Sequence, residues 1–227
     1  MRMTRTLLAL TFIALQGTSQ AATYDLAADW APNANPNGTW SFRSGDTLLP
    51  WHDSICCMGF PTGGYAPGAT AGVFLPLFFQ RQPGADVGLH TFDEGNGRGA
   101  SGEATLVWTA TETGLLDIRM YLYWEQAPLS RSNDYTMSLG AQMLASGTLS
   151  FLAHNGYANR QILSFDDLQV TQGDQMRLVF KRSPGFHPGT VSYIGMTLDV
   201  TPIPEPGTYA LMLAGLAALG GLARKRR

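Results

Sequence analysis

The sequence predicts an all-β protein built as an antiparallel β-sandwich, and three observations support this. Several runs alternate apolar and polar residues with a period of two, which is typical of half-buried strands. Turn-forming residues separate these runs at short intervals. Between the two chain ends there is one lysine, Lys181, among many Thr and aromatic residues, a composition that favours strands over helices. Together these features predict two packed antiparallel sheets.

The first clear strands lie at residues 103–109 and 116–122. Their apolar side chains share one face of each run: Ala104, Leu106 and Trp108 in the first, and Leu116, Ile118, Met120 and Leu122 in the second. Glu112, Thr113 and Gly114 form a turn between the runs, so we expect the two strands to pair as a hairpin.

Later runs follow the same rule. After a turn at Gly173 and Asp174, residues 175–181 place Met176, Leu178 and Phe180 together. The last strand, at residues 192–200, turns four side chains inward: Ile194, Met196, Leu198 and Val200. Other strands are predicted at residues 39–43, 72–80, 134–139 and 149–152.

The N-terminal end is typical of a secretory signal peptide. Arg2 and Arg5 precede an apolar run at residues 7–15, and small residues follow. We expect residues 1–21 to be removed by cleavage between Ala21 and Ala22. The sandwich domain then covers residues 22–200, which is long enough to bury a full core.

The charge of the mature region argues against nucleic acid as a partner. Six of the 15 basic residues lie in the two chain ends, which leaves nine against 16 acids up to residue 203, a net charge of about −7. Proteins that bind nucleic acid need a basic face. An acidic body is compatible with divalent cations.

The C-terminal end has three parts in a fixed order. A proline-rich linker at residues 201–208 holds Pro204, Glu205 and Pro206, and an uncharged apolar run fills residues 209–223. The chain then ends in Arg224, Lys225, Arg226 and Arg227. The 15 apolar residues would form a helix of about 22 Å, against about 30 Å of bilayer hydrocarbon. We therefore predict a marginal membrane span whose basic end stays in the cytoplasm; an ordinary tail anchor is the alternative.

This end resembles the PEP-CTERM sorting signal of Gram-negative bacteria, over about 26 residues. The resemblance implies processing by exosortase, a membrane cysteine protease, at a motif formed by Pro204, Glu205 and Pro206. It implies a precursor anchored in the membrane and a mature protein at the cell surface or in the extracellular matrix. It carries no information about activity.

The body is similar to a β-sandwich domain of exported bacterial proteins whose fold resembles jelly-roll carbohydrate-binding modules. Four features carry this: residues 30–42, with Asn35, Pro36 and Gly38 before Trp40; His90; residues 108–114; and Asp174 with residues 190–200. The chain departs from that family at residues 192–195, where an Asp usually follows the Tyr. The resemblance therefore does not extend to a cation or ligand role at that corner.

Candidate chemical groups are few. Cys56 and Cys57 are adjacent, too close for an unstrained disulfide, so a strained ring, a bridge between two chains and buried thiols stay open. His52 is a conceivable base for a nucleophilic Cys57. The four scattered histidines (His52, His90, His154 and His187) are predicted to be turn or packing residues.

Oxygen ligands gather at Asp93, Glu94 and Asn96, in a Gly-containing loop that fits either a Ca²⁺ site or a solvated hairpin. Asp166, Asp167 and Asp174 allow the same two interpretations. No other cofactor is predicted. The sequence has no hydrolase elbow, zinc-protease motif, phosphate loop or dinucleotide fingerprint, so we expect no catalysis.

Aromatic residues are the stronger functional signal. Tyr121, Tyr123 and Trp124 are predicted at or beyond outward positions of their strand, where they could stack on sugar rings. Four more aromatics lie in Gly- and Pro-rich loops: Trp30, Trp40, Trp51 and Tyr65. The alternative is that these rings cap the sandwich edge.

Two functions follow from these observations. The first is a non-catalytic surface or matrix protein associated with exopolysaccharide. The second is a glycan-binding module, with or without Ca²⁺. A hydrolase is the third and weakest hypothesis.

Overall fold

A computed structural model describes residues 21–55, 63–70, 75–91, 102–125, 131–184, 190–203, 213–217 and 221 of the 227-residue chain. Residues 21–203 form one compact unit. Every buried apolar residue of the described chain lies between Leu26 and Val200. The compact unit therefore carries its own hydrophobic core.

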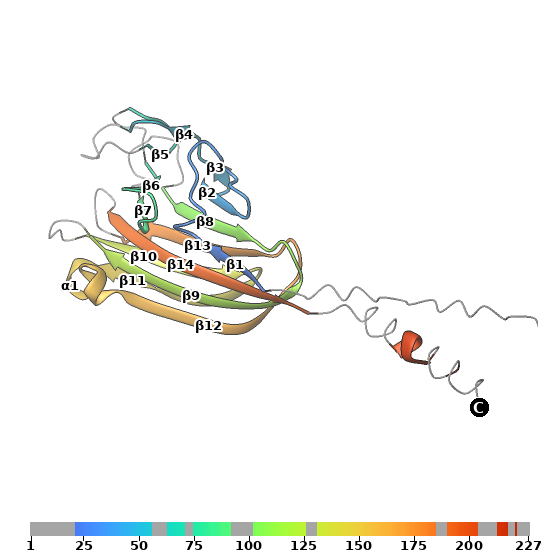
Figure 1. Ribbon diagram of the computed structural model, residues 1–227. Helices are drawn as coiled ribbons and strands as arrows, with labels where there is room; N and C mark the ends of the chain where they lie inside the picture. Colours follow the sequence, from blue (N-terminus) through green and yellow to red (C-terminus); the bar gives the residue numbers. More distant parts are fainter. Residues whose placement is uncertain are drawn as a thin grey trace, which may run out of the picture. The chain divides into compact units, whose positions relative to one another are not determined.

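The described strands form two antiparallel sheets (Figure 1). The eight-stranded sheet has the order β12 (Gln161–Val170), β9 (Gly114–Trp124), β14 (Val191–Pro202), β7 (Val87–His90), β6 (Leu77–Gln80), β5 (Gly64–Tyr65) and β4 (Trp51–His52), with β1 (Ala22–Asp25) also paired to β14. The six-stranded sheet has the order β11 (Gln142–Ser150), β10 (Ser132–Leu139), β13 (Gln175–Arg182), β8 (Ala104–Thr109), β2 (Trp40–Ser44) and β3 (Thr47–Leu48). The predicted all-β sandwich is confirmed.

The predicted hairpin between the first two clear strands is wrong. β8 pairs with β13 and β2 in one sheet, whereas β9 pairs with β12 and β14 in the other. The turn between β8 and β9 therefore crosses from sheet to sheet, as in double-sheet jelly rolls. A crossing and a hairpin both need turn residues, so the alternating pattern could not separate them. Backbone bonds from Gly173 to Ala110 and from Ala110 to Asp174 tie this crossing to the turn before β13.

The predicted inward faces are confirmed. Leu116, Ile118, Met120 and Leu122 of β9 are buried, as are the apolar residues predicted to face inward on β8, β13 and β14. Trp40, Trp108 and Phe180 are among the largest fully buried side chains. Period-two alternation thus identified the core because each of these strands turns one face toward the opposite sheet.

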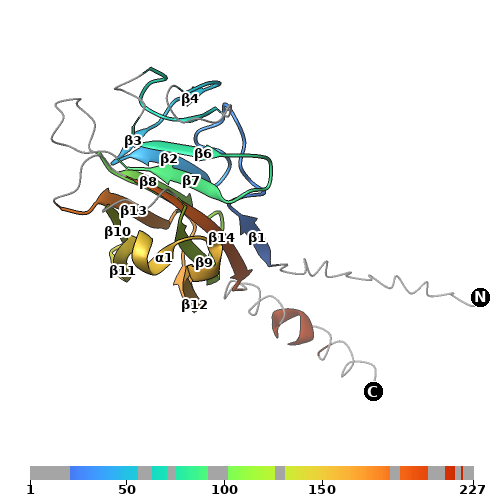
Figure 2. The same ribbon diagram turned by 90° about the vertical axis from the view of Figure 1, so that its left-hand side faces the viewer.

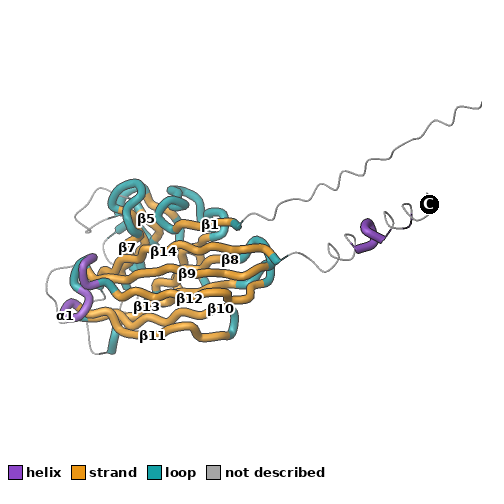
Figure 3. Tube along the Cα trace, turned by 60° about the horizontal axis from the view of Figure 1, so that its bottom comes forward, coloured by secondary structure: helices purple, strands orange, loops and turns teal. Residues whose placement is uncertain are grey.

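Some strand predictions need correction. The strand predicted at residues 149–152 ends at Ser150, where β11 gives way to the short helix α1 (Phe151–His154), and a 3₁₀ turn, η2 (Tyr157–Asn159), follows. Figures 2 and 3 show α1 beside the ends of β9 and β11. Strands β1, β7 and β12, and the two-residue strands β3, β4 and β5, were not predicted from the sequence. β12 escaped notice because a bulge between Phe165 and Leu168 breaks its alternation.

The segment before β2 contains the motif with Asn35 and Gly38, and its contacts explain why this motif is typical of the fold. The Asn35 side chain donates to the carbonyl oxygens of Phe42 and Leu49, at 2.7 and 2.8 Å, and accepts from the Phe42 backbone N–H at 3.0 Å. Gly38 has a φ of +55°, which few other residues adopt easily. These residues therefore fix a turn.

The C-terminal segment is described only in part. Residues 213–217 and 221 are helical. Among the described residues, none belongs to a helix with the length and apolarity needed to cross a bilayer. The sorting motif at Pro204, Glu205 and Pro206 and the basic end at residues 224–227 lie outside the described residues.

Candidate ligand-binding pocket

The outer face of the eight-stranded sheet carries a row of aromatic side chains. Tyr121 and Tyr123 project from β9 on the side opposite to its buried Leu and Ile residues, because side chains alternate along a strand. Tyr193 of β14 lies directly opposite Tyr123 in the register. Their rings stack with centroids 5.2 Å apart and planes 14° apart. Phe79 of β6 continues the row, edge-on to Tyr193 at 5.8 Å.

Two glycines let the rings of Tyr121 and Phe79 lie against the sheet. Gly195 of β14 is opposite Tyr121, and a Cβ atom at Gly195 would overlap the Tyr121 ring. In the same way, a Cβ at Gly88 of β7 would overlap the ring of Phe79. The absence of two side chains thus makes room for the rings of Tyr121 and Phe79.

One carboxylate anchors both tyrosines of β9. Asp86, just before β7, accepts a hydrogen bond from the Tyr121 hydroxyl at 2.8 Å through Oδ1 and one from the Tyr123 hydroxyl at 3.0 Å through Oδ2. Burial raises the pKa of both phenols far above the ordinary value, and the hydrogen bond and the charge of Asp86 raise it further. Both tyrosines are therefore neutral donors at any physiological pH.

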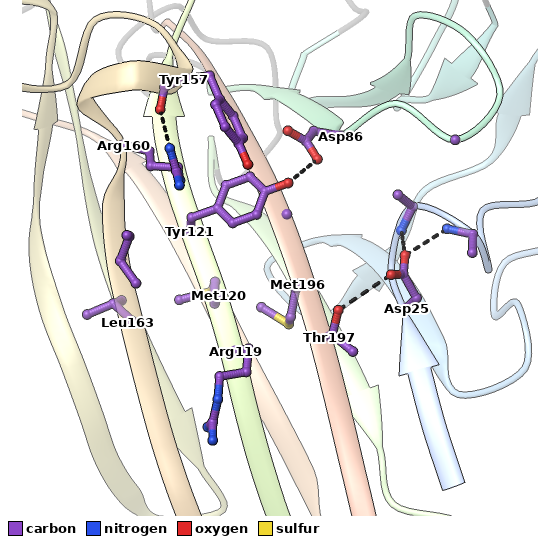
Figure 4. Close-up of a pocket in the computed structure, with 15 residues that line it drawn as sticks. Asp25, Asp86, Arg119, Met120, Tyr121, Tyr157, Arg160, Leu163, Met196 and Thr197 are labelled. Carbon is purple, nitrogen blue, oxygen red and sulfur yellow. Dashed lines mark hydrogen bonds between the residues drawn. The ribbon is translucent and has the colours of Figure 1, made fainter.

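A pocket of about 560 Å³ opens beside Tyr121 (Figure 4). Tyr157 of η2 stands at one end with 51% of its surface exposed and meets Tyr121 edge-to-face at 5.2 Å. The guanidinium of Arg160 lies over the Tyr157 ring, 4.1 Å from its centroid. The lining also includes Asp25, Asp86, Arg119, Thr197 and the exposed Ile162, and it includes Met120, Leu163 and Met196, which pack with the core.

The charged groups of the pocket are held in different ways. Asp25 Oδ1 accepts from the backbone N–H groups of Ala27 and Ala28, each at 2.9 Å, and Oδ2 lies 3.4 Å from the Thr197 hydroxyl. Arg119 forms an ion pair with Asp166 on the neighbouring strand. The hydrogen bond from Arg119 to Asp166 raises the pKa of the guanidinium. These contacts leave a pocket with both apolar and polar walls.

The three residues predicted to bind glycan differ in how exposed they are in the structure. Tyr121 lies at the pocket, half-buried. Tyr123 faces outward as predicted, but it is only 8% exposed because Tyr157 and Tyr193 pack against it. The position predicted for Trp124 is wrong: it is fully buried, since it shares the inward side of β9 with Leu122.

The loop aromatics are also not displayed. Trp40 and Tyr65 are buried, and Trp30 and Trp51 are half-buried and pack against Tyr65 at 5.2 and 5.1 Å. The Tyr65 hydroxyl donates to backbone carbonyls of Ala31 and Ala34. These rings therefore build the fold around the turn before β2.

Sequence reasoning missed Asp86, Tyr157 and Arg160. The last two lie in the Asn- and Gly-containing connection from α1 to β12, where an aromatic and an arginine three residues apart were the available signal. Asp86 lies 35 residues from Tyr121, and only the sheet register brings the two together. Nothing local in the sequence marks it.

The other candidates have structural partners or lie outside the described chain. His52 contacts the Ala66 carbonyl at 3.2 Å, and His154 accepts from the Ser150 backbone N–H at 3.3 Å. Burial lowers the pKa of His90 to about 4, so its ring is neutral and bonds the Thr91 carbonyl at 2.7 Å. These three histidines have turn or packing contacts, as predicted.

Two of the candidate carboxylates outside the pocket have partners in the protein. Asp174 accepts from the Thr171 backbone N–H in its turn, and Asp166 pairs with Arg119. Within the ranges that the structure describes, no three His, Cys, Asp or Glu side chains gather as metal ligands. Cys56, Cys57, His187 and the candidate calcium ligands Asp93, Glu94 and Asn96 lie outside these ranges.

Comparison with known proteins identifies the chain end. Residues 202–227 match a family described as the PEP-CTERM protein-sorting motif. The predicted sorting signal is confirmed, and the motif implies an exported protein that is made as a membrane-anchored precursor. A search of curated proteins finds no match to the chain.

Several solved structures are similar to the body at low scores. The CBM22-1 xylan-binding domain of Paenibacillus barcinonensis Xyn10C has 6% identity over 81% of this chain and 95% of its own, with a TM-score of 0.34. The C-terminal CBM6 of the laminarinase LamC of Zobellia galactanivorans has 9% identity over 50% of this chain and 80% of its own, with a TM-score of 0.28. A Podospora anserina GH26-CBM35 mannanase has 12% identity over 83% of this chain, which spans 29% of that enzyme, with a TM-score of 0.31. Scores this low carry no argument about ligand or activity.

Proposed function

We propose that the protein is an exported, non-catalytic glycan-binding protein that associates with exopolysaccharide at the cell surface or in the extracellular matrix of a Gram-negative bacterium. One observation carries the binding role: the pocket beside Tyr121, walled by the half-exposed ring of Tyr157. Aromatic faces next to hydrogen-bonding groups suit sugars, which have both apolar ring faces and hydroxyl edges.

The polar walls favour this ligand class. Tyr121 lies flat over Gly195 and is fixed by Asp86, so the platform is ordered before a ligand arrives. Preorganised groups lose little entropy on binding. Arg160 and Thr197 add hydrogen-bonding groups to the lining of the pocket, where sugar hydroxyls need partners.

The state of the carboxylates favours binding over catalysis. Asp86 accepts a tyrosine hydroxyl on each oxygen, and Asp25 is held by two backbone N–H groups and approached by Thr197. A general acid or base must reach its substrate directly or through one water. Carboxylates committed to protein donors in this way favour a non-catalytic role. The calcium role suggested by Asp93, Glu94 and Asn96 stays a prediction.

The test of binding is a single substitution with a matched control. Tyr157→Ala in residues 21–203 should lower retention on immobilised exopolysaccharide several-fold, since one stacked ring is worth about 1 kcal/mol. The melting temperature should hardly move, because half of the side chain is already exposed. Leu152→Ala, at a 95% exposed residue of α1, is the control and should change neither property. Unchanged retention by the Tyr157 variant would leave a matrix protein that does not use this pocket.

Sorting has its own test. We propose that exosortase processes the precursor at Pro204, Glu205 and Pro206, and that the segment at residues 209–223 holds it in the membrane until then. Replacing the three motif residues with alanine should leave the full-length protein in the membrane fraction. A released form of unchanged mass would contradict this route.

A further inference from the structure

We propose that the pocket binds an acidic sugar residue, a uronic acid, and that Arg160 holds its carboxylate. This inference rests on the proposed glycan-binding function and names the class of sugar. It follows from which charged side chains of the pocket already have a partner and which do not.

The acidic side chains of the pocket are already occupied. Asp86 accepts from Tyr121 and Tyr123, and Asp25 accepts from Ala27 and Ala28. An ionised carboxylate is negatively charged and only accepts hydrogen bonds, so neither group can pair with an anionic group of a ligand. Any ion pair between the pocket and an acidic sugar must therefore come from its arginines.

The two arginines differ. Arg119 is paired with Asp166, and the charges of Asp117 and Asp199 are also near it. Arg160 donates one hydrogen bond, from Nη1 to the Tyr157 carbonyl at 2.9 Å, and otherwise lies against rings. Among the residues that the structure describes, no carboxylate forms an ion pair with Arg160. Arg160 is thus the cation of the pocket that still lacks an anion.

The position of Arg160 suits a carboxylate attached to a stacked ring. Its guanidinium lies 4.1 Å from the Tyr157 centroid and 5.6 Å from that of Tyr121, and these ring contacts do not use its N–H groups. Figure 4 shows Arg160 and Asp86 on opposite sides of the Tyr121 ring. A sugar on this platform can therefore direct its carboxylate to the guanidinium fork, which matches carboxylates in a bidentate geometry.

The overall charge makes such a contact selective. The body up to residue 203 has nine basic residues against 16 acidic ones. Its field repels acidic polymers, so general electrostatic attraction would not explain their binding. Binding of a polyuronate would instead require a local cation such as Arg160.

The experiment compares polymers that differ in one group. Residues 21–203 are titrated with polygalacturonate and with the same polymer after reduction of its carboxylates to alcohols. We expect at least about tenfold tighter binding of the acidic form, the gain of one charge-assisted bidentate contact. Arg160→Gln should abolish this preference, and Arg160→Lys should restore part of it because it keeps the charge without the fork. Arg177→Gln is the control: Arg177 pairs with Asp46, away from the pocket, and the variant removes the same charge.

Each outcome decides one point. Equal binding of the two polymers would overturn the uronate assignment and leave glycan binding intact. Binding of neither polymer would contradict both the glycan-binding function and the uronate assignment for polymers with this sugar backbone. An Arg160→Gln variant that weakens both polymers equally would make Arg160 a structural support for Tyr157. Dextran sulfate bound as tightly as polygalacturonate, with dextran unbound, would show that the site reads charge and not a carboxylate.

Discussion

Two aromatic clusters in this protein look alike in ring geometry and differ in what holds them. The loop cluster consists of Trp30, Phe42, Trp51 and Tyr65, with Phe42 and Tyr65 stacked at 4.9 Å. The outer-face cluster consists of Tyr121, Tyr123, Tyr157 and Tyr193, with Tyr123 and Tyr193 stacked at 5.2 Å. The Tyr65 hydroxyl bonds backbone carbonyls, whereas Tyr121 and Tyr123 bond the side chain of Asp86.

This difference separates a fold element from a candidate binding surface. A ring tied to backbone carbonyls fixes the path of the chain and has no face to offer, as Tyr65 shows with no exposed surface. A ring tied to one side chain at the outer face can stay partly exposed, as Tyr121 does. Stacking distance alone therefore does not identify a ligand platform.

The largest expected effect comes from removing a ring of the loop cluster. Phe42→Ala should cost about 3–5 kcal/mol, because Phe42 is 1% exposed and contacts Trp30, Tyr65 and Phe78. For a unit of this size, each kcal/mol lowers the melting temperature by about 2–4 °C. Glycan retention at a temperature where the variant is folded should match that of the parent. Thermal melting close to that of the parent would show that this cluster does not hold the fold.

The sequence predicted which side chains of each strand face the core better than it predicted which strands pair. Burial of one strand face imposes a period of two, so Leu116 to Leu122, the inward side of β13 and the inward side of β14 could be recognised directly. Strand partners depend on distant residues, and the turn after β8 therefore suggested a hairpin where the chain crosses between sheets.

The same limit applies to the candidate site. The parity of β9 put Tyr121 on the correct face, but it could not reveal which rings would be covered. Tyr123 is covered by Tyr157, in the connection from α1 to β12, and by Tyr193 of β14. Asp86 binds the hydroxyls of Tyr121 and Tyr123 from across the sheet. The pocket exists because five segments that are distant in sequence meet there, so its lining residues could be identified only from the structure.

A pair of glycine substitutions sharpens the contrast between platform and support. Gly195→Ala and Gly88→Ala each place a Cβ into an aromatic ring, Tyr121 in the first case and Phe79 in the second. Overpacking of this kind costs about 1–3 kcal/mol, so both variants should melt at a lower temperature. Only Gly195→Ala should weaken glycan retention, because Phe79 does not line the pocket. Equal retention by both variants would mean that the position of Tyr121 over Gly195 is not required for binding.

The finest comparison removes one hydroxyl from each cluster. Tyr65→Phe should lower the free energy of unfolding by about 1–3 kcal/mol, because the carbonyls of Ala31 and Ala34 lose a buried donor. Tyr193→Phe should be neutral or stabilising by up to about 1 kcal/mol. The Tyr193 hydroxyl is buried with no hydrogen-bond partner in the described structure, so its removal relieves a desolvation cost. Its stacking on Tyr123 and the contact with Arg81 involve the ring, which the substitution keeps.

Urea denaturation of both variants measures the two free energies of unfolding. The dependence of each free energy on urea concentration should stay the same, because neither substitution changes the surface exposed on unfolding. A Tyr193→Phe variant as unstable as Tyr65→Phe would show that this hydroxyl has a partner after all, and the two clusters would then be held by equivalent bonds.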